Sequence, residues 1–233
     1  MMRSGALNEY EATEPMSAFK WDKLIEIIKI QDVASVAARA VKNLQYEKSF
    51  NMPQKQREEV QTLANNTKSH SLNIELHSKM LNKRFKAIHA KQKNGDETVK
   101  TSLEIFNVLI LNCQNLLNEG ISMRLIILLG NIIRLKGNGV DYEKIDSWLE
   151  ETHMQKVAQL VGSILINNFS FRKEELPFVK KIDNKASRVM MTNLKSNKPE
   201  RHNKGITYFE YAPLENTSII VNRLKGRLEV ADE

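Results

Sequence analysis

The amino-acid sequence predicts a mainly α-helical protein, folded as an irregular multi-helix single domain or as two lobes. Over most of residues 17–195 apolar residues recur at intervals of three and four, which is the spacing of amphipathic helices. The apolar density is highest at residues 103–166, where we expect the core. The two ends of the chain lack this pattern, which predicts a flexible N-terminal arm and a small non-helical or β region at the C-terminus.

The N-terminal part of the sequence divides into an arm and helical segments. Residues 1–16 are small, acidic and without periodicity, and they predict the flexible arm. Ser17 is a suitable N-cap for one or two helices that extend to Leu44. Pro53 then marks another helix start, because proline in the first turn loses no hydrogen bond. The polar helical pattern that follows extends to Lys93, with a break expected in the sequence NNTKSHS.

The central helices of the sequence are apolar on nearly every side. Asn94 and Gly95 end the preceding helix, and Asp96 is the expected N-cap of the next. Asp141 is the expected cap of a later helix that extends to about Asn168. Helices with so little polar surface must be buried on most sides, and they often find a partner subunit. We therefore also expect a homo-oligomer.

The last part of the sequence combines one more helix with a change of character. An amphipathic pattern follows Pro177 and extends to Lys195. Residues 196–233 begin as a basic linker and continue in the β-branched and aromatic runs ITYFEY and SIIVNRL, separated by APLEN. These runs predict a small C-terminal hairpin or an extended arm.

The chain is basic, and its excess charge is confined to two segments. It contains 35 Lys and Arg residues against 28 Asp and Glu, a net charge of +7 at pH 7. Residues 51–100 contain ten basic and five acidic residues, and residues 151–200 contain nine and five. This distribution indicates a negatively charged partner.

The first basic segment places lysines on one side of a predicted helix and apolar residues on the other. Because a helix turns by about 100° per residue, four lysines fall within an arc of about 80°. These are Lys79, Lys83, Lys86 and Lys93. Leu81, Phe85 and Ile88 lie opposite them, and the segment contains no acidic residue. Its expected phosphate-binding residues are Lys79, Lys83, Arg84, Lys86, Lys91 and Lys93.

The second basic segment repeats this arrangement on the helix predicted after Pro177. Its basic residues are spaced by four, three and seven, opposite a set of apolar residues. The expected binding residues of the helix are Lys181, Lys185, Arg188 and Lys195. The basic linker adds Lys198, Arg201 and Lys204.

Two basic faces on an apolar helical body are suited to binding the phosphate backbone of a nucleic acid. Each phosphate that a lysine neutralises releases counterions, so a basic cluster supplies affinity that does not depend on sequence. We therefore expect a protein that binds RNA or single-stranded DNA, of nucleoprotein, coat or matrix type. The alternatives are a merely solvated lysine face, an anionic membrane surface as partner, and a helical adaptor that binds another protein through its apolar faces.

The motifs of common enzyme and cofactor sites do not occur in the sequence. It contains no G-x-x-x-x-G-K-[ST] loop, and its five histidines lack metal-ligand spacing. The carboxylates of DYEKIDSWLEE are interpreted as a solvated acidic face. We therefore predict no enzymatic activity, no cofactor and no metal.

The cellular location is predicted to be intracellular, cytoplasmic or nuclear, and not secreted. The uncharged stretch at residues 105–118 is shorter than the about 20 apolar residues of a membrane span. The N-terminus lacks the basic start and apolar middle of a signal peptide. The single cysteine, Cys113, lies in an apolar run and is expected in the core rather than as a reactive thiol.

Overall fold

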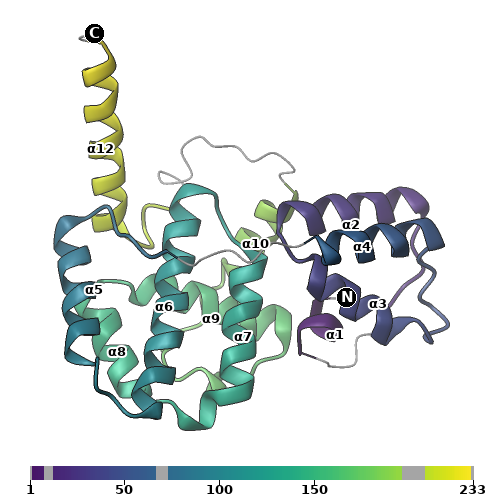
Figure 1. The fold of residues 1–233 in the computed structure, drawn as a ribbon, viewed down its shortest axis with the longest axis horizontal. Helices are drawn as coiled ribbons and strands as arrows, with labels where there is room; N and C mark the ends of the chain where they lie inside the picture. The colour runs from purple at the N-terminus through teal and green to yellow at the C-terminus, as the bar shows by residue number, and fades with distance from the viewer. Residues whose placement is uncertain (1, 8–12, 67–72, 196–207, 232–233) are drawn as a thin grey trace. The chain divides into compact units, whose positions relative to one another are not determined.

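The computed structural model describes residues 2–7, 13–66, 73–195 and 208–231 (Figure 1). These residues form eleven α-helices and two short 3₁₀ helices, and none of them lies in a β-strand. The mainly α-helical class predicted from the sequence is confirmed. The chain divides into two compact units, residues 1–71 with 192–199 (unit 1) and residues 72–191 with 200–233 (unit 2).

The described part of unit 1 contains four complete helices, and the second begins where the sequence predicts. The helices are α1 (Met2–Leu7), α2 (Ala18–Ile30), α3 (Ala34–Leu44) and α4 (Gln54–Asn65). The Ser17 hydroxyl accepts a hydrogen bond from the Lys20 N–H at 3.4 Å and caps α2. Between α2 and α3, Asp32 adopts a φ of 50°, which separates the predicted segment into two helices.

The prediction of a flexible arm is wrong for residues 2–7, which form α1 against α3. The contact depends on small residues, because a Cβ at Gly5 would lie 2.0 Å from the Val36 carbonyl oxygen. Asn43 donates a hydrogen bond to the Ser4 carbonyl at 3.0 Å, and Ala6 is buried. A helix of six residues that packs through Ser, Gly and Ala is too short to show the apolar periodicity that marks a helix in the sequence. Residues 8–12 of the predicted arm lie outside the described residues.

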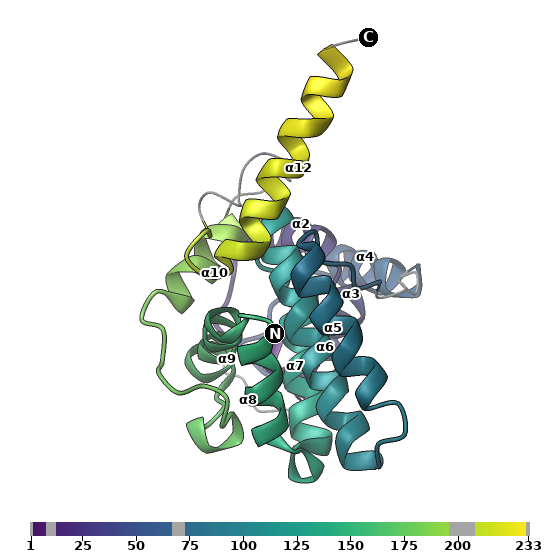
Figure 2. The ribbon, with the colours of Figure 1, turned by 90° about the vertical axis from the view of Figure 1, so that its left-hand side faces the viewer.

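Unit 2 contains the remaining helices. They are α5 (Lys79–Lys91), α6 (Glu97–Asn118), α7 (Met123–Lys136), η1 (Gly137–Gly139), α8 (Tyr142–Glu151), α9 (Gln155–Phe169), η2 (Lys173–Glu175), α12 (Pro213–Ala231) and most of α10 (Ala186–Lys195), whose residues from Thr192 belong to unit 1. Figures 1 and 2 show α6 among α5, α7, α8 and α9. No helix in the described part of the chain combines the length and apolar character that crossing a membrane requires.

The core of unit 2 is centred on α6, as the apolar density of the sequence predicts. Thirteen of its 22 residues are buried, among them Phe106 and Leu109, so other helices cover it on nearly every side. The predicted caps are also confirmed. Asp96 accepts from the Val99 N–H at 2.9 Å, and Asp141 accepts from the Lys144 N–H at 3.0 Å.

The prediction of a helix directly after Pro177 is wrong, because residues 178–185 are not helical and α10 begins only at Ala186. Phe178 and Val179 are both buried, although neighbouring residues of a helix point about 100° apart. They pack against α9 at Gly162, where a Cβ would lie 2.2 Å from Cγ2 of Val179. The close approach holds this segment against α9 with a non-helical backbone, whereas its amphipathic pattern predicts a helix.

The prediction of a C-terminal hairpin or an extended arm is also wrong for residues 213–231, which form α12. Pro213 occupies the first helical position, where its missing N–H loses nothing. Ile219, Ile220 and Val221 favour a strand, but a strand needs a neighbour, whereas a helix satisfies its backbone internally. Figure 2 shows α12 projecting from the other helices of unit 2. The basic linker at residues 196–207 lies outside the described residues.

The close approach at Gly162 predicts a large effect of a small substitution. Gly162→Ala should lower the free energy of unfolding by about 1–3 kcal/mol, because the added methyl group forces residues 178–179 away from α9. This loss should occur although alanine is the better helix former by about 1 kcal/mol. Urea denaturation measures the change.

Gly139→Ala is the matched control for this prediction, because a Cβ at Gly139 meets no atom within 4 Å. The control should stay within about 0.5 kcal/mol of the wild type. Equal stabilities of the two variants would contradict the packing role of Gly162.

Candidate nucleic-acid interface

Helix α5 is held against the core by its apolar side. The Ser78 hydroxyl caps it by accepting from the Leu81 N–H at 3.4 Å. Leu81, Phe85 and Ile88 are buried, as the sequence predicts, and the Phe85 ring lies 6.0 Å from the Phe106 ring of α6. Because this side of α5 packs inward, the lysines on the other side must face outward.

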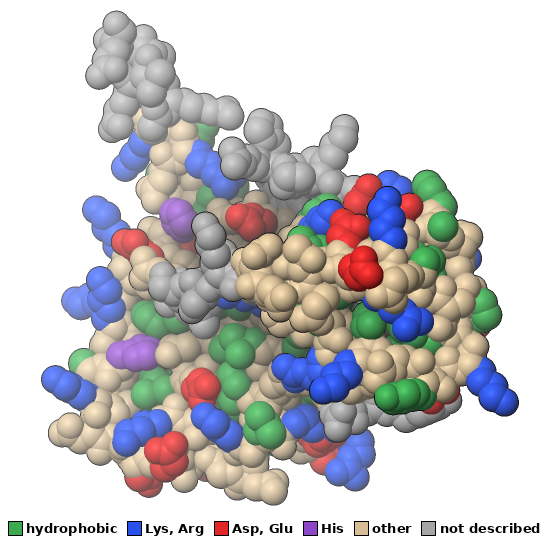
Figure 3. Space-filling view, turned by 45° about the vertical axis from the view of Figure 1, so that its right-hand side comes forward, with side chains coloured by type: hydrophobic (Ala, Val, Ile, Leu, Met, Phe, Trp, Pro, Cys, Tyr) green, Lys and Arg blue, Asp and Glu red, His purple; other side chains and the backbone are tan. Residues whose placement is uncertain are grey.

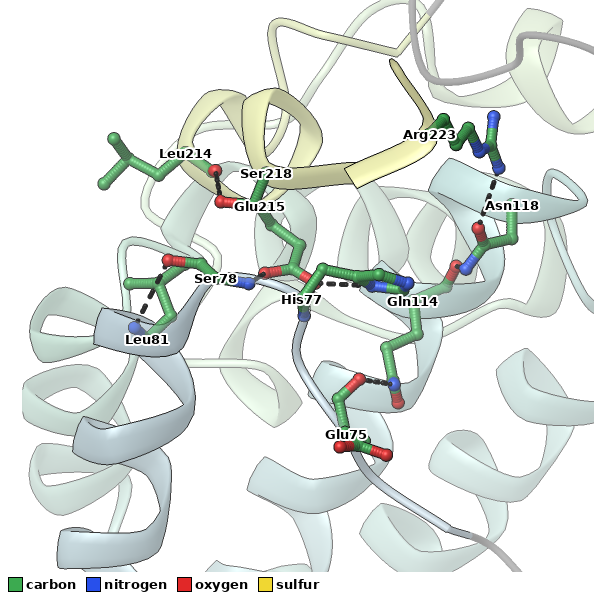
Figure 4. Close-up of polar contacts among 10 residues, drawn as sticks. All are labelled: Glu75, His77, Ser78, Leu81, Gln114, Asn118, Leu214, Glu215, Ser218 and Arg223. Atoms are coloured by element: carbon green, nitrogen blue, oxygen red, sulfur yellow. Dashed lines mark hydrogen bonds and ion pairs between the residues drawn. The ribbon is translucent and has the colours of Figure 1, made fainter. Parts of the chain in front are cut away.

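The N-terminus of α5 is tied to α12 by a buried carboxylate (Figure 4). Glu215, whose side chain has no exposed surface, accepts the backbone N–H of His77 at 2.6 Å and that of Ser78 at 3.0 Å. Farther along α12, the Arg223 guanidinium donates to the Asn118 side chain at 3.3 Å. The negative charge also complements the positive end of the α5 dipole, since the first turn of α5 contains no acidic residue.

The outer face of α5 consists of lysines without partners. Lys79, Lys83 and Lys86 are exposed. None of the three makes an ion pair or a side-chain hydrogen bond with a residue that the structure describes. Figure 3 shows Lys and Arg side chains standing out into solvent along the edge of unit 2.

The other three basic residues of this segment are placed differently. Arg84 is half-buried and donates to the Glu151 carbonyl at 2.7 Å, with its guanidinium 3.1 Å from Nε2 of His153. Lys91 is the last residue of α5. Lys93 lies beyond the helix, so its predicted place on the helical face with Lys79 is wrong. The structure therefore brings only part of the predicted set onto one face.

The second basic segment does not form one helical face, because residues 178–185 are not helical. Lys181 is exposed in this non-helical segment. Lys185 makes an ion pair with Glu210 at 3.0 Å. Arg188 is exposed on α10 and has no ion pair with a described residue.

The rest of the second predicted set lies partly outside the described residues. Lys195 is the last residue of α10, and its side chain is not described. Lys198, Arg201 and Lys204 lie outside the described residues altogether.

A pocket of about 330 Å³ joins Lys181 and Lys185 to residues that the sequence did not single out. Lys156 and Gln159, from the first turns of α9, line it together with Tyr211. Lys156 stands alone in its sequence neighbourhood, so no local charge pattern marks it. Only the packing of residues 178–185 on α9 brings it close to Lys181.

The turn between α8 and α9 connects the two basic groups within unit 2. Arg84 contacts Glu151 and His153 at this turn, and Lys156 of the pocket follows three residues later.

The described residues do not assemble a recognisable catalytic or metal site. No group of three His, Cys, Asp or Glu residues able to hold a metal ion occurs among them. Cys113 is fully buried, and desolvation, with a smaller effect from Glu215, raises the pKa of its thiol far above the usual range. A thiol of this kind is a core residue rather than a nucleophile.

Comparison with known proteins gives no relative from which a function could be transferred: no family model, no curated protein and no solved structure matches the chain.

The buried carboxylate predicts a local effect at the start of α5. Glu215→Gln keeps the shape but removes the charge and leaves a single acceptor oxygen for two N–H groups, so the free energy of unfolding should fall by about 1–2 kcal/mol. The backbone amides of His77 and Ser78 should also exchange with solvent faster. Glu75→Gln, an exposed neighbour, is the control and should leave both measurements unchanged. Unaltered exchange in Glu215→Gln would contradict the assigned contact.

The burial of Cys113 predicts protection from thiol reagents. Because the raised pKa keeps the thiol protonated and the fold covers it, an aromatic disulfide reagent at mildly alkaline pH should label native protein only as fast as the protein opens. Unfolding in urea should make labelling immediate. Rapid stoichiometric labelling of the folded protein would show that the thiol is accessible.

Proposed function

We propose that unit 2 binds the phosphate backbone of RNA or single-stranded DNA with little preference for sequence. The observation that carries this proposal is the outer face of α5, where Lys79, Lys83 and Lys86 stand without ionic partners among the described residues. Lys181 and Arg188 add further cations that have no ionic partner in the described part of the chain.

The contrast with the ion-paired lysines of the chain supports a binding role for α5. Several exposed lysines elsewhere are paired, for example Lys136 with Glu104 at 2.8 Å and Lys23 with Glu26 at 2.9 Å. On α5, by contrast, neighbouring lysines three and four residues apart repel one another by roughly 0.2–0.5 kcal/mol per pair. A bound polyanion would remove this repulsion and release counterions as it binds.

A binder of this kind fits a structural role in packaging nucleic acid, as in a nucleoprotein, coat or matrix protein. Such a role does not require recognition of a particular base sequence. Self-association remains a prediction. The apolar residues of the central helices that suggested it are buried inside unit 2, so they offer no surface to a second subunit.

A helical protein-binding adaptor is the second candidate, and α12 favours it. Leu214, Val221 and Leu224 are exposed there to 40%, 41% and 54%. Their spacing of seven and three places them on one side of the helix. In an adaptor the lysines of α5 would only keep the protein in solution.

Salt dependence and charge reversal distinguish the two functions. Lys83→Glu/Lys86→Glu should weaken binding of a labelled single-stranded oligonucleotide at least about tenfold at low salt, because two phosphate contacts are lost. The log-log slope of affinity against salt should become shallower by roughly 1.4, since each single-strand contact contributes about 0.7. Fluorescence anisotropy measures both.

Lys20→Glu/Lys42→Glu is the control, because it makes the same change of net charge at exposed positions of unit 1. It should reduce affinity far less than the α5 variant. Equal losses in the two variants would show that only the total charge matters. No binding by the wild type at low salt would refute the proposal and leave the adaptor.

A further inference from the structure

The pocket on unit 2 differs from the α5 face in that its acidic groups are already engaged. Asp183 accepts the Tyr211 hydroxyl at 2.8 Å and the Lys185 backbone N–H at 2.8 Å. Glu210 is paired with Lys185 through both carboxylate oxygens, at 3.0 and 3.3 Å. Desolvation and the hydrogen bond to Asp183 raise the pKa of Tyr211, so its hydroxyl stays a donor to that carboxylate at neutral pH.

Two lysines of the pocket remain unpaired. Lys156 and Lys181 make no ion pair and no side-chain hydrogen bond with any residue in the described part of the chain. They come from different elements, Lys156 from α9 and Lys181 from the segment that packs on α9, and both line the same cavity. Gln159 and Asn184 line it too, and an amide side chain can supply neutral donors.

We infer that this pocket binds a phosphate monoester, the terminal phosphate of a nucleotide or of a nucleic-acid strand, between Lys156 and Lys181. The strand-end form of this inference rests on the proposed function. A monoester carries about 1.5–2 negative charges near pH 7, whereas an internal phosphodiester carries one. Two lysines that line one cavity without ionic partners among the described residues match the doubly charged group.

The shape of the site points to a chain end rather than to a passing backbone. The α5 face is one side of an exposed helix, along which successive phosphodiesters can lie. The pocket, in contrast, is bounded by three segments of unit 2: the first turns of α9, residues 181–185 and residues 210–211. Its volume of about 330 Å³ exceeds that of a phosphate and leaves room for the attached sugar.

The test compares ligands that differ only in the terminal phosphate. One arm uses fluorescence anisotropy to measure the affinity for two single-stranded oligonucleotides of the same sequence. Both have a fluorescent label at the 3′ end, and one has a 5′-phosphate where the other has a 5′-hydroxyl. The other arm measures adenosine 5′-monophosphate against adenosine by titration calorimetry. We expect the phosphorylated member of each pair to bind about tenfold more tightly or better, as charge-assisted hydrogen bonds to two lysines imply.

Lys156→Gln/Lys181→Gln should abolish this preference in both arms, and both positions are exposed, so the fold should tolerate the change. Lys83→Gln/Lys86→Gln on α5 is the matched variant. It should weaken both oligonucleotides by the same factor and preserve the preference.

The outcomes separate the two proposals. The inference about the pocket is overturned if neither phosphorylated ligand is preferred, or if the preference survives in Lys156→Gln/Lys181→Gln. Equal binding of the two strands would still agree with the proposed function. If no strand binds, the proposed function fails, and only the nucleotide arm then tests whether the pocket binds a phosphate monoester. A preference confined to the nucleotide arm identifies a free nucleotide, and one in both arms includes the strand end.

Discussion

The burial of α6 is the constraint on which the rest of unit 2 depends. A helix that is apolar on nearly every side has to be covered, and α5, α7, α8 and α9 supply the cover. Covering α6 uses the apolar side of α5, where the Phe85 ring contacts that of Phe106. The outward lysine face is therefore a consequence of the core, and α5 needs no additional interaction to present it.

Two polar or steric details then fix segments that have fewer apolar contacts. Glu215 reaches from α12 to the start of α5 and satisfies two backbone N–H groups that the helix itself leaves free. Gly162 lets residues 178–179 approach the α9 backbone more closely than any side chain would allow. The first contact orients the basic helix, and the second brings the non-helical basic segment beside Lys156.

The resulting surface combines two kinds of positive site. The α5 face is open and its lysines act separately, which suits a repeated, singly charged group. The pocket is lined by two lysines from different elements that have no ionic partner among the described residues, which suits a single group of higher charge. The turn between α8 and α9, which Arg84 contacts, lies beside both. In the proposed function, the first site would contact the backbone of a strand and the second its end.

The sequence by itself determined the helical class, the core around α6, the caps at Ser17, Asp96 and Asp141, and the lysine face of α5, because periodicity and capping are local properties. Only the tertiary structure decided the rest. The non-helical residues 178–185 depend on a close approach to α9, and the pocket depends on residues distant in sequence. The helical form of α12, in place of the predicted hairpin or extended arm, satisfies the backbone where no described residue forms a strand, and Glu215 docks it at the start of α5. Such choices arise from contacts between distant residues, which local periodicity does not record.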